Sequence, residues 1–255
     1  MDFGRTRFAI TFGDVACTHI GGQEHGFKAR EGFTCSELKS VRCIQGEWYD
    51  LSANLPDGVR ERNEAGLLVI RNFTKPLGET SADYIYNELK GLEWDKKYWD
   101  VRRSATLNKR ARYNTTFGDF HQAHSEDFKV PTVHSYESVP GLSVLRQYLP
   151  MVFGRKAEDL PAEGNFYYEE KSGIGYHGDR ERKKVICLSL GKSTGLFFGW
   201  RSPGSSNLYG NLMEIPIHHG DLYVMSEKAT GSDWLMTSQW RLVHAAGNEK
   251  YTQHK

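Results

Sequence analysis

The residues best suited to metal chemistry in this chain are a histidine and an aspartate separated by one glycine, His177-Gly178-Asp179. Side chains two positions apart on a strand point to the same side, so the pair offers one nitrogen and one oxygen to a cation. A second histidine from a distant part of the chain would complete a face of two histidines and one carboxylate. Such a face leaves positions on Fe(II) open for a co-substrate and O2. His-x-Asp is common by chance, so the surrounding residues must carry the prediction.

Three histidines further along the chain are candidates for the distant ligand. His244 follows residues 240–243, which have the pattern of a strand that could end at the same end of the core. His218 and His219 instead open a strand at a turn, which is typical of a surface corner. The positions that we expect to bind the metal and form the catalytic centre are therefore His177, Asp179 and His244.

The composition limits the class of protein. With 255 residues, 38% of them hydrophobic and 13% aromatic, the chain can bury a full core, so we expect one domain, with or without an extension. The net charge of +1 excludes a protein-wide cationic surface, so any basic surface must be local. No apolar run resembles a signal peptide or a membrane span, and the four cysteines lack paired spacing. These features favour a soluble intracellular protein of the cytoplasm or nucleus, without a membrane partner, and we expect a monomer.

The first sixty residues are the least informative. Alternation of apolar and other residues from Phe8 to Phe12 predicts a short, half-buried strand. Cys17, His19 and His25 lie close together, but their spacing lacks the signature of a zinc site. Ordinary packing is therefore the favoured interpretation.

Helices and strands are predicted in separate parts of the remaining chain. Thr80 is a suitable N-cap for a helix whose buried face would be Ala82, Ile85, Tyr86 and Leu89. A second helix spans residues 138–149, with Leu142, Leu145 and Leu149 inward and Pro150 as its stop. Short apolar stretches separated by glycines predict the strands 165–168, 185–190, 196–200, 213–217, 222–225 and 239–243. This order indicates an α+β fold, a sandwich or barrel with the helices packed on one face of the β-core. The expected domains are an extension of uncertain structure, residues 1–60, and a main domain, residues 61–255.

Residues 96–113 form a locally basic region. Its cations are Lys96, Lys97, Arg102, Arg103, Lys109, Arg110 and Arg112, and its interleaved aromatic residues are Tyr98, Trp99 and Tyr113. Basic and stacking groups together suit a nucleic-acid backbone and an unpaired base. A solvated face with extended side chains is an equally good interpretation. The next stretch, residues 112–119, is expected to be a loop that overhangs a site.

The sequence resembles the AlkB-like family of Fe(II)/2-oxoglutarate dioxygenases over about residues 66–253. The most specific feature is Asn165-x-Tyr167, placed ten residues before His177-x-Asp179 and followed by the strand LSLG. The other matching pieces are LLVIRNF, KRARYNTTFGD, HGDLYVM and VHAAG. The resemblance implies a double-stranded β-helix (jelly-roll, cupin-like) for the main domain, with Fe(II) as metal and 2-oxoglutarate and O2 as co-substrates.

The resemblance also implies roles for the matching residues. His177, Asp179 and His244 would bind Fe(II), and Asn165 and Tyr167 would hydrogen-bond 2-oxoglutarate. The residues expected to contact the substrate are Glu181, just after the triad, and Arg110, Arg112, Tyr113 and Phe117, in or beside the overhanging loop. The implied reaction converts 2-oxoglutarate and O2 to succinate and CO2 while the substrate is hydroxylated. A hydroxylated N-methyl group then leaves as formaldehyde.

One feature departs from the family pattern. The family usually carries Arg-x-Asn-x-Thr-x-Arg on the strand after the distal histidine, and its first arginine holds the far carboxylate of 2-oxoglutarate. Here the residues after His244, AAGNEKYTQHK, contain no arginine, although a desolvated carboxylate needs a cation. Lys250 is the best positional match, followed by Lys255 and Arg241. A lysine supplies charge without the bidentate fork, so we expect a weaker or differently aimed grip.

Three functions are consistent with the sequence. The first is an AlkB-like oxygenase that oxidises a modified base in DNA or RNA, which the basic region and Glu181 favour. The second is an oxygenase of the same fold that acts on a protein or a small molecule, which the near-zero net charge favours. The third is a non-catalytic module that binds nucleic acid or protein, and the complete set of ligand positions argues against it.

Overall fold

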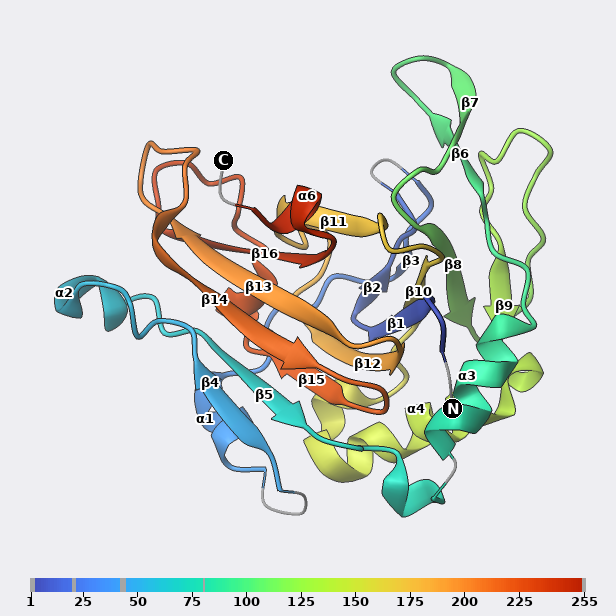
Figure 1. Cartoon of the computed structure of the whole chain (residues 1–255), viewed down its shortest axis with the longest axis horizontal. Coiled ribbons are helices and arrows are strands. Elements are labelled where there is room, and N and C mark those ends of the chain that lie inside the picture. Colours follow the sequence, from blue (N-terminus) through green and yellow to red (C-terminus); the bar gives the residue numbers. More distant parts are fainter. Residues whose placement is uncertain (1–2, 20–21, 42–44, 80, 254–255) are drawn as a thin grey trace.

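The computed structural model describes residues 3–19, 22–41, 45–79 and 81–253. Across these residues the chain is mostly β-sheet with a few helices. An eight-stranded sheet and a four-stranded sheet face one another, and helices cover the other face of the larger sheet (Figure 1). The prediction of a β-core with helices on one face is confirmed at this level.

The large sheet is antiparallel except at one edge, where its last two strands pair in parallel. Its strands, in spatial order, are β4 (Glu47–Asp50), β5 (Gly66–Ile70), β15 (Leu222–Met225), β12 (Val185–Gly191), β1 (Arg7–Phe12), β10 (Ala162–Tyr167), β8 (Tyr113–Gly118) and β9 (Val133–Ser135). Strands from the beginning, middle and end of the chain therefore alternate within one layer.

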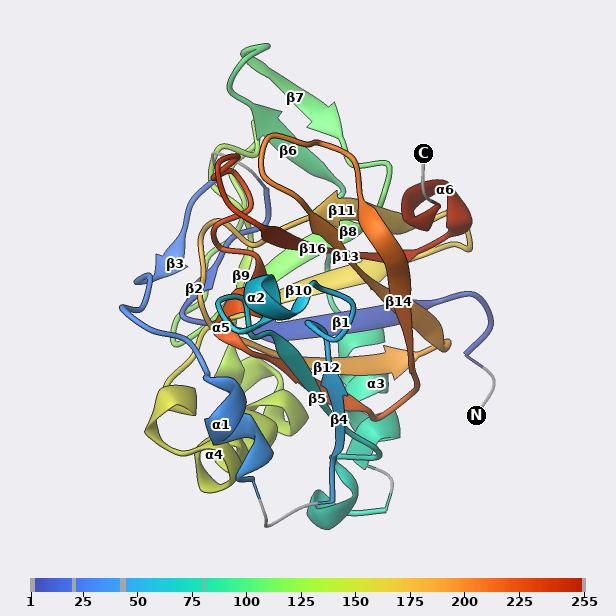
Figure 2. The ribbon, with the colours of Figure 1, turned by 90° about the vertical axis from the view of Figure 1, so that its left-hand side faces the viewer.

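The small sheet is antiparallel and lies in front of the large sheet in the side view (Figure 2). Its strands are β11 (Gly173–His177), β16 (Arg241–Gly247), β13 (Thr194–Arg201) and β14 (Tyr209–Ile217). Two short ribbons complete the β-structure: β2 (Val15–Ala16) with β3 (His25–Gly26), and β6 (Lys97–Asp100) with β7 (Ala105–Asn108). The β6–β7 hairpin projects from the body of the molecule in both views (Figures 1 and 2).

The two longest helices are α3 (Ser81–Lys90) and α4 (Pro140–Phe153). Their buried residues are Ile85, Tyr86, Leu89, Leu142, Leu145 and Leu149. All six were predicted from the helical period, and each buried leucine contributes about 1.5–3 kcal/mol. Ala82, which was also predicted to be buried, is only partly buried. Thr80, the expected N-cap, lies outside the described residues. Pro150 does not end the second helix, because α4 continues for another turn to Gly154, whose N–H bonds the Pro150 carbonyl.

The remaining helices are short. They are α1 (Cys35–Lys39), α2 (Asp57–Arg60), α5 (Glu227–Thr230), α6 (Glu249–Thr252) and the 3-10 turns Lys75–Leu77, Tyr136–Ser138 and Arg155–Ala157. Thr34 caps α1 in a capping box with Glu37. No helix in the described part of the chain is both long and apolar enough to cross a membrane.

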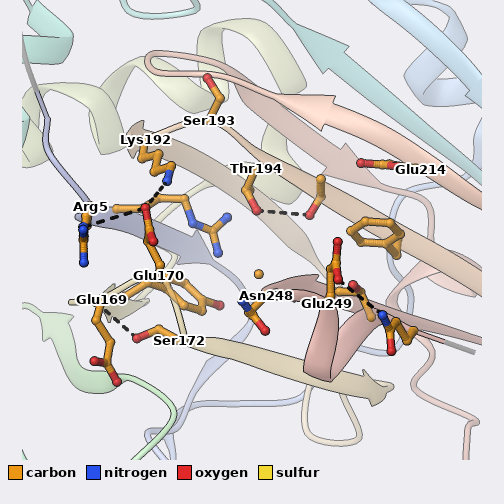
Figure 3. Close-up of a pocket in the computed structure, with 17 residues that line it drawn as sticks. Arg5, Glu169, Glu170, Ser172, Lys192, Ser193, Thr194, Glu214, Asn248 and Glu249 are labelled. Carbon is orange, nitrogen blue, oxygen red and sulfur yellow. Dashed lines mark hydrogen bonds and ion pairs between the residues drawn. The ribbon is translucent and has the colours of Figure 1, made fainter. Parts of the chain in front are cut away.

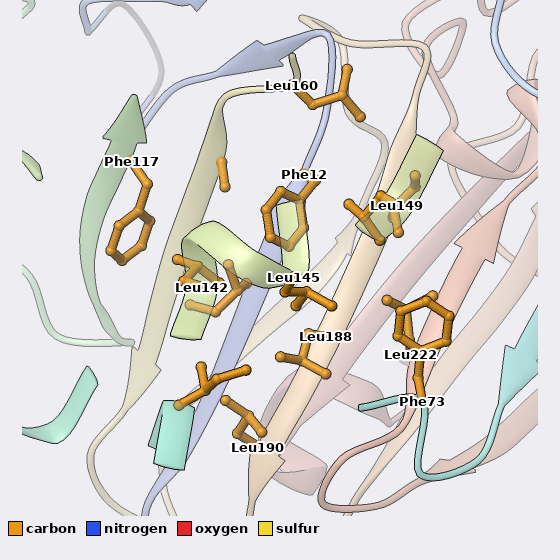
Figure 4. Packing of buried hydrophobic residues seen from close by; sticks show 14 of the residues in the cluster. Phe12, Phe73, Phe117, Leu142, Leu145, Leu149, Leu160, Leu188, Leu190 and Leu222 are labelled. Carbon is orange, nitrogen blue, oxygen red and sulfur yellow. The ribbon is translucent and has the colours of Figure 1, made fainter. Parts of the chain in front are cut away.

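Strand β1 is buried on both faces because it lies in the middle of the large sheet. Phe8, Ile10 and Phe12 point toward the helices and are fully buried. Figure 4 shows this helix-side core, in which Phe12 packs among leucines of α4 and β12. The alternate residues of β1, among them Arg7 and Ala9, face the small sheet and are also buried. The predicted half-buried strand is therefore a central one.

The stretch expected to be an overhanging loop, residues 112–119, is instead largely strand β8, so this prediction is wrong. It pairs with β10 from Tyr113 to Phe117, and its β-branched threonines suit a strand once a neighbour is present. Phe117 is fully buried in the helix-side core, where it contacts Tyr136. It is not placed to contact a substrate.

The predicted boundary at residue 60 stays a prediction. From the first sixty residues, β1 pairs with β10 and β12, and β4 pairs with β5. Strands on both sides of the boundary therefore share the large sheet.

Candidate metal centre

The three expected metal ligands lie together at one end of the small sheet. His177 is the last residue of β11, and His244 lies directly opposite it on β16. Asp179 follows β11, with its Oδ1 atom 3.7 Å from Nε2 of each histidine. Their ligand atoms all lie within 4.8 Å of one another, and no other such group of three occurs in the described residues. Two imidazole nitrogens and one carboxylate oxygen at this spacing can share a divalent ion such as Fe(II).

Backbone packing fixes the turn between the two nearby ligands. The Asp179 N–H donates to the Thr230 carbonyl over 2.8 Å. A Cβ atom on Gly178 would lie 2.2 Å from the carbonyl oxygen of Gly231, which caps α5 in the left-handed conformation. Glycine is therefore required between His177 and Asp179, because α5 passes too close for any side chain.

The imidazole of His177 is oriented by its own backbone. Its Nδ1 lies 2.8 Å from the Gly175 carbonyl, which can only accept a hydrogen bond, so Nδ1 carries the proton and Nε2 is free for a metal. Burial lowers the pKa of His177 to about 4. Burial, and then the neighbouring His177, hold the pKa of His244 well below its usual range. Both imidazoles are therefore neutral at pH 7, which is the form that binds metals.

Asp179 belongs to a buried group of carboxylates around one arginine. Burial raises the pKa of Asp179, and the Arg182 guanidinium opposes that rise. Arg182 is 3% exposed and lies 2.6 Å from Glu163 and 2.6 Å from Glu181, with Asp179 at 3.7 Å. A divalent cation at the cluster would favour the ionised form of Asp179. The sequence reasoning did not single out Arg182, although it stands three residues after Asp179.

The two residues expected to bind 2-oxoglutarate point from β10 toward the small sheet. Asn165 accepts hydrogen bonds from the Arg112 guanidinium and, over 2.7 Å, from Asn114. It also donates to Glu163 over 3.2 Å. Arg112 thus lies at the site as a support for Asn165 rather than in a lid.

Tyr167 is the second of these two residues, and it lies beside a cation that the sequence reasoning missed. The Arg7 guanidinium stacks 4.0 Å above the centre of the Tyr167 ring. Both side chains are almost fully buried, with 7% exposure each.

The structure does not place the predicted cations near the cluster. Arg241 donates hydrogen bonds to the loop carbonyls of Ser202 and Ser205, so its guanidinium is directed at that loop. Lys250 is exposed on α6, where its ammonium group lies over the Tyr251 ring, so it does not reach the interior. Lys255, the other candidate, lies outside the described residues.

The residues expected to contact the substrate are scattered. Glu181 lies at the metal cluster, 24% exposed and paired with Arg182. Tyr113 stacks on Tyr168 with ring centres 4.2 Å apart, on the face of β8 opposite to Asn114. Arg110 is exposed, and its carbonyl accepts a hydrogen bond from Tyr168. Only Glu181 and Arg112 of this predicted set therefore lie at the cluster.

The basic region forms much of the β6–β7 hairpin. Lys96, Lys97, Arg102 and Arg103 are exposed along it, and Trp99 is covered by the ammonium group of Lys129 at 4.3 Å. The hairpin continues into β8, whose first residues adjoin the site. The basic hairpin is therefore linked along the chain to Arg112 and Asn114, which contact Asn165.

Lys109, at the base of this hairpin, differs from the other cations. Its Nζ atom is buried and has no hydrogen-bond partner within the described part of the chain. Burial lowers the pKa of Lys109 to about 8. The nearby Cys17, His19 and His25 do not form a three-residue metal group in the described residues. Ordinary packing remains the better interpretation of these three residues.

A cleft of about 630 Å³ opens where β1, β10, β13 and the end of β16 meet (Figure 3). Glu170 lies on one side of it, paired with Lys192 at 3.0 Å and with Arg5 at 3.8 Å. Its inner wall includes Arg7 and Tyr167, whereas none of the three metal-ligand candidates lines it. Arg7 and Tyr167 thus line the cleft, and Tyr167 lies two residues from Asn165 on β10.

Comparison with known proteins gives a family and a distant similarity. No protein-family model matches the chain. The chain is 27% identical to the alpha-ketoglutarate-dependent dioxygenase alkB homolog 3 of Mus musculus, over 60% of the chain and 54% of that protein. It is equally similar to the Rattus norvegicus homologue, over 52% of that protein, so it spans about half the length of these dioxygenases. It is 36% identical to the uncharacterized protein R156 of Acanthamoeba polyphaga mimivirus, over 96% of both chains. The chain therefore belongs to the same family as mimivirus protein R156.

Proposed function

We propose that the protein is an Fe(II)- and 2-oxoglutarate-dependent dioxygenase that oxidises a modified nucleobase in DNA or RNA. The observation that carries this proposal is the convergence of two histidine Nε2 atoms on one aspartate oxygen, at 3.7 Å each. The distant similarity to alkB homolog 3 supports the same chemistry. The proposal includes a double-stranded β-helix, for which the two facing sheets and the placement of the cluster between them are the support.

Each part of the chain has a defined task in this proposal. His177, Asp179 and His244 hold the metal, while Asn165 and Tyr167 contact the keto acid. With 2-oxoglutarate and O2, the bound iron supplies the oxidising power: one oxygen atom enters succinate as CO2 leaves, and the other enters the substrate.

A nucleic-acid substrate is favoured by the β6–β7 hairpin. Its exposed lysines and arginines suit phosphate contacts, and the metal cluster is reachable from outside because His177 retains 26% side-chain exposure. A base held in a duplex cannot reach a recessed metal, so the target base must be unpaired or flipped out. Glu181, 24% exposed beside the cluster, is placed to contact the edge of such a base.

Anaerobic titration with Fe(II) and then 2-oxoglutarate tests the chemistry. Chelation of the keto acid by iron gives a weak visible charge-transfer band, which should form in wild type and disappear in His177→Ala. His218→Ala is the matched control, because His218 lies outside the cluster and contacts Ser193. Bound iron without a band in the wild-type protein would contradict the proposal.

The nucleic-acid part is tested separately with a double Arg102→Ala, Arg103→Ala variant and a methylated oligonucleotide. Each lost phosphate contact should weaken binding and lower the slope of log K against log salt by about 0.7–0.9. Arg62→Ala, an exposed arginine just after α2, is the control. If the hairpin variant binds the oligonucleotide as tightly as wild type and remains catalytically active, a protein or small-molecule substrate is favoured instead.

A further inference from the structure

Strand β1 occupies a decisive place in the large sheet. It is hydrogen-bonded to β10 on one side and to β12 on the other, over its full length from Arg7 to Phe12. Because both of its edges are paired, no other strand can lie between β10 and β12. Any side chain that enters the space between the two sheets from between β10 and β12 must therefore belong to β1.

The residues of β1 that face the small sheet form rungs with those of β10. Thr11 lies opposite Glu163, Ala9 opposite Asn165, and Arg7 opposite Tyr167. The Glu163 rung adjoins the metal cluster, because Arg182 joins Glu163 to Asp179. Successive rungs are about 7 Å apart along a strand. In order of distance from the metal cluster, the rungs are therefore those of Glu163, then Asn165, then Arg7 and Tyr167.

Arg7 is a buried cation with unused hydrogen-bonding capacity. It is 7% exposed, and among the described residues its Nη2 atom has no hydrogen-bond partner. Ser189 on β12, opposite Ala9, also has a buried hydroxyl without a partner. Buried polar groups are rarely left unpaired, since each costs free energy. The unpaired groups of Arg7 and Ser189 lie on adjacent rungs, which indicates a pocket for a polar ligand. Because the guanidinium of Arg7 is a cation, that ligand should be an anion.

We propose that Arg7 binds the distal carboxylate of 2-oxoglutarate, an inference that rests on the proposed function. A five-carbon diacid spans about 5 Å between its carboxyl carbons, from four C–C bonds of about 1.5 Å. With a charge-assisted hydrogen bond of about 2.8 Å added at the distal carboxylate, this length covers the step of about 7 Å from the Asn165 rung to the Arg7 rung. The planar guanidinium can form a bidentate pair with the carboxylate, and Tyr167 lies beneath it to orient the fork.

The sequence of β1 supports this assignment. Arg7-x-Ala9-x-Thr11 matches the family pattern Arg-x-Asn-x-Thr at its first and third named positions. Gly13 stands where the pattern has its second arginine, and a Cβ atom there would lie 2.7 Å from the Lys184 carbonyl oxygen and 3.2 Å from the Cδ of Arg182. The backbone of Lys184 thus leaves no room for a side chain at this position.

The test compares two keto acids in the anaerobic iron protein. 2-Oxopentanoate has the same carbon chain as 2-oxoglutarate but no distal carboxylate. Wild type should prefer 2-oxoglutarate, and Arg7→Met should weaken its binding by about 30-fold or more, with 2-oxopentanoate and Fe(II) binding unchanged. Arg7→Lys should give an intermediate loss. Arg5→Met is the control, because Arg5 lines the same cleft with its side chain 74% exposed.

The outcomes separate this proposal from the proposed function. Wild-type affinity of Arg7→Met for 2-oxoglutarate would overturn the role of Arg7 and leave the dioxygenase intact. Loss of affinity for both keto acids alike would also overturn it, because the effect would not depend on the distal carboxylate. If Arg7→Met does not fold, the same comparison is made with Arg7→Lys: the ratio of its affinities for 2-oxoglutarate and 2-oxopentanoate decides. Iron binding without chelation of either keto acid in wild type would end both proposals.

Discussion

Replacing Arg182 with methionine should destabilise the protein more than any surface charge change. Arg182 is 3% exposed and lies 2.6 Å from Glu163, which is itself only 7% exposed. Glu181 and Asp179 complete the group at 2.6 and 3.7 Å. Methionine fills a similar volume but leaves these carboxylates buried without their cation.

The expected magnitude follows from the cost of an uncompensated buried charge. Two charges about 4 Å apart interact by about 4 kcal/mol at an effective dielectric constant of 20. Removal of one partner of a buried pair typically costs about 3–5 kcal/mol, and we expect this range for Arg182→Met. For a chain of this length, that loss lowers the melting temperature by roughly 6–20 °C. Glu163→Gln alone should cost less, because Arg182 then keeps two carboxylate neighbours.

Urea unfolding of the metal-free protein at pH 7 measures these effects in a double-mutant cycle. The combined Arg182→Met, Glu163→Gln variant should be more stable than the sum of the single losses predicts, by at least about 1.5 kcal/mol. The control is Arg60→Met, since Arg60 pairs with Asp50 on the surface and should cost below about 1 kcal/mol. A loss of less than 1 kcal/mol for Arg182→Met, or strict additivity, would refute the buried-charge account.

Three further predictions concern the metal turn, the metal itself and a buried lysine. Gly178→Ala should lower Fe(II) affinity, measured by calorimetry, at least about 10-fold, because its Cβ would lie 2.2 Å from the Gly231 carbonyl oxygen. Gly175→Ala is the control and should keep its affinity, because the nearest atom to its Cβ would be 3.8 Å away. Fe(II) at 100 times its Kd should stabilise the folded protein by about 2.7 kcal/mol, and either a chelator or His244→Ala should abolish that thermal shift. Burial lowers the pKa of Lys109 to about 8, so its charge destabilises the folded state at neutral pH, and this penalty fades as pH rises from 8 toward 10.5. Lys109→Met should therefore stabilise by about 1–3 kcal/mol at pH 7 and by little near pH 10.5 in urea unfolding, and a gain independent of pH would contradict this reasoning.

The metal cluster was predictable because two local rules place it. Side chains two apart share one side of a strand, which joins His177 to Asp179. The apolar pattern before His244 indicated a strand that could end near them, and the structure pairs His244 with His177 directly. The same reasoning identified the buried faces of α3 and α4, because helical periodicity is also a local property.

Arg7, the cation proposed to bind the keto acid, was not predictable in this way. Periodicity shows which residues of β1 share a face, but it does not show which strands lie beside β1. The pairing of Arg7 with Tyr167 joins positions separated by most of the chain. Among the described residues after His244, the candidate was Lys250, which is exposed on α6. Phe117 was misplaced for a related reason, since β8 becomes a strand only when β10 supplies its partner.

A sheet position is defined by its neighbours and not by the order in which the chain reaches it. β1 is antiparallel to both β10 and β12, so it presents Arg7 beside Tyr167 wherever its ends connect. Its other face fills the helix-side core with Phe8, Ile10 and Phe12, so the same strand stabilises the fold and offers a charge to the pocket. A change that removed β1 would therefore remove both its core residues and Arg7. Arg7→Met removes only the cation, because it alters only the face of β1 that is turned toward the metal cluster.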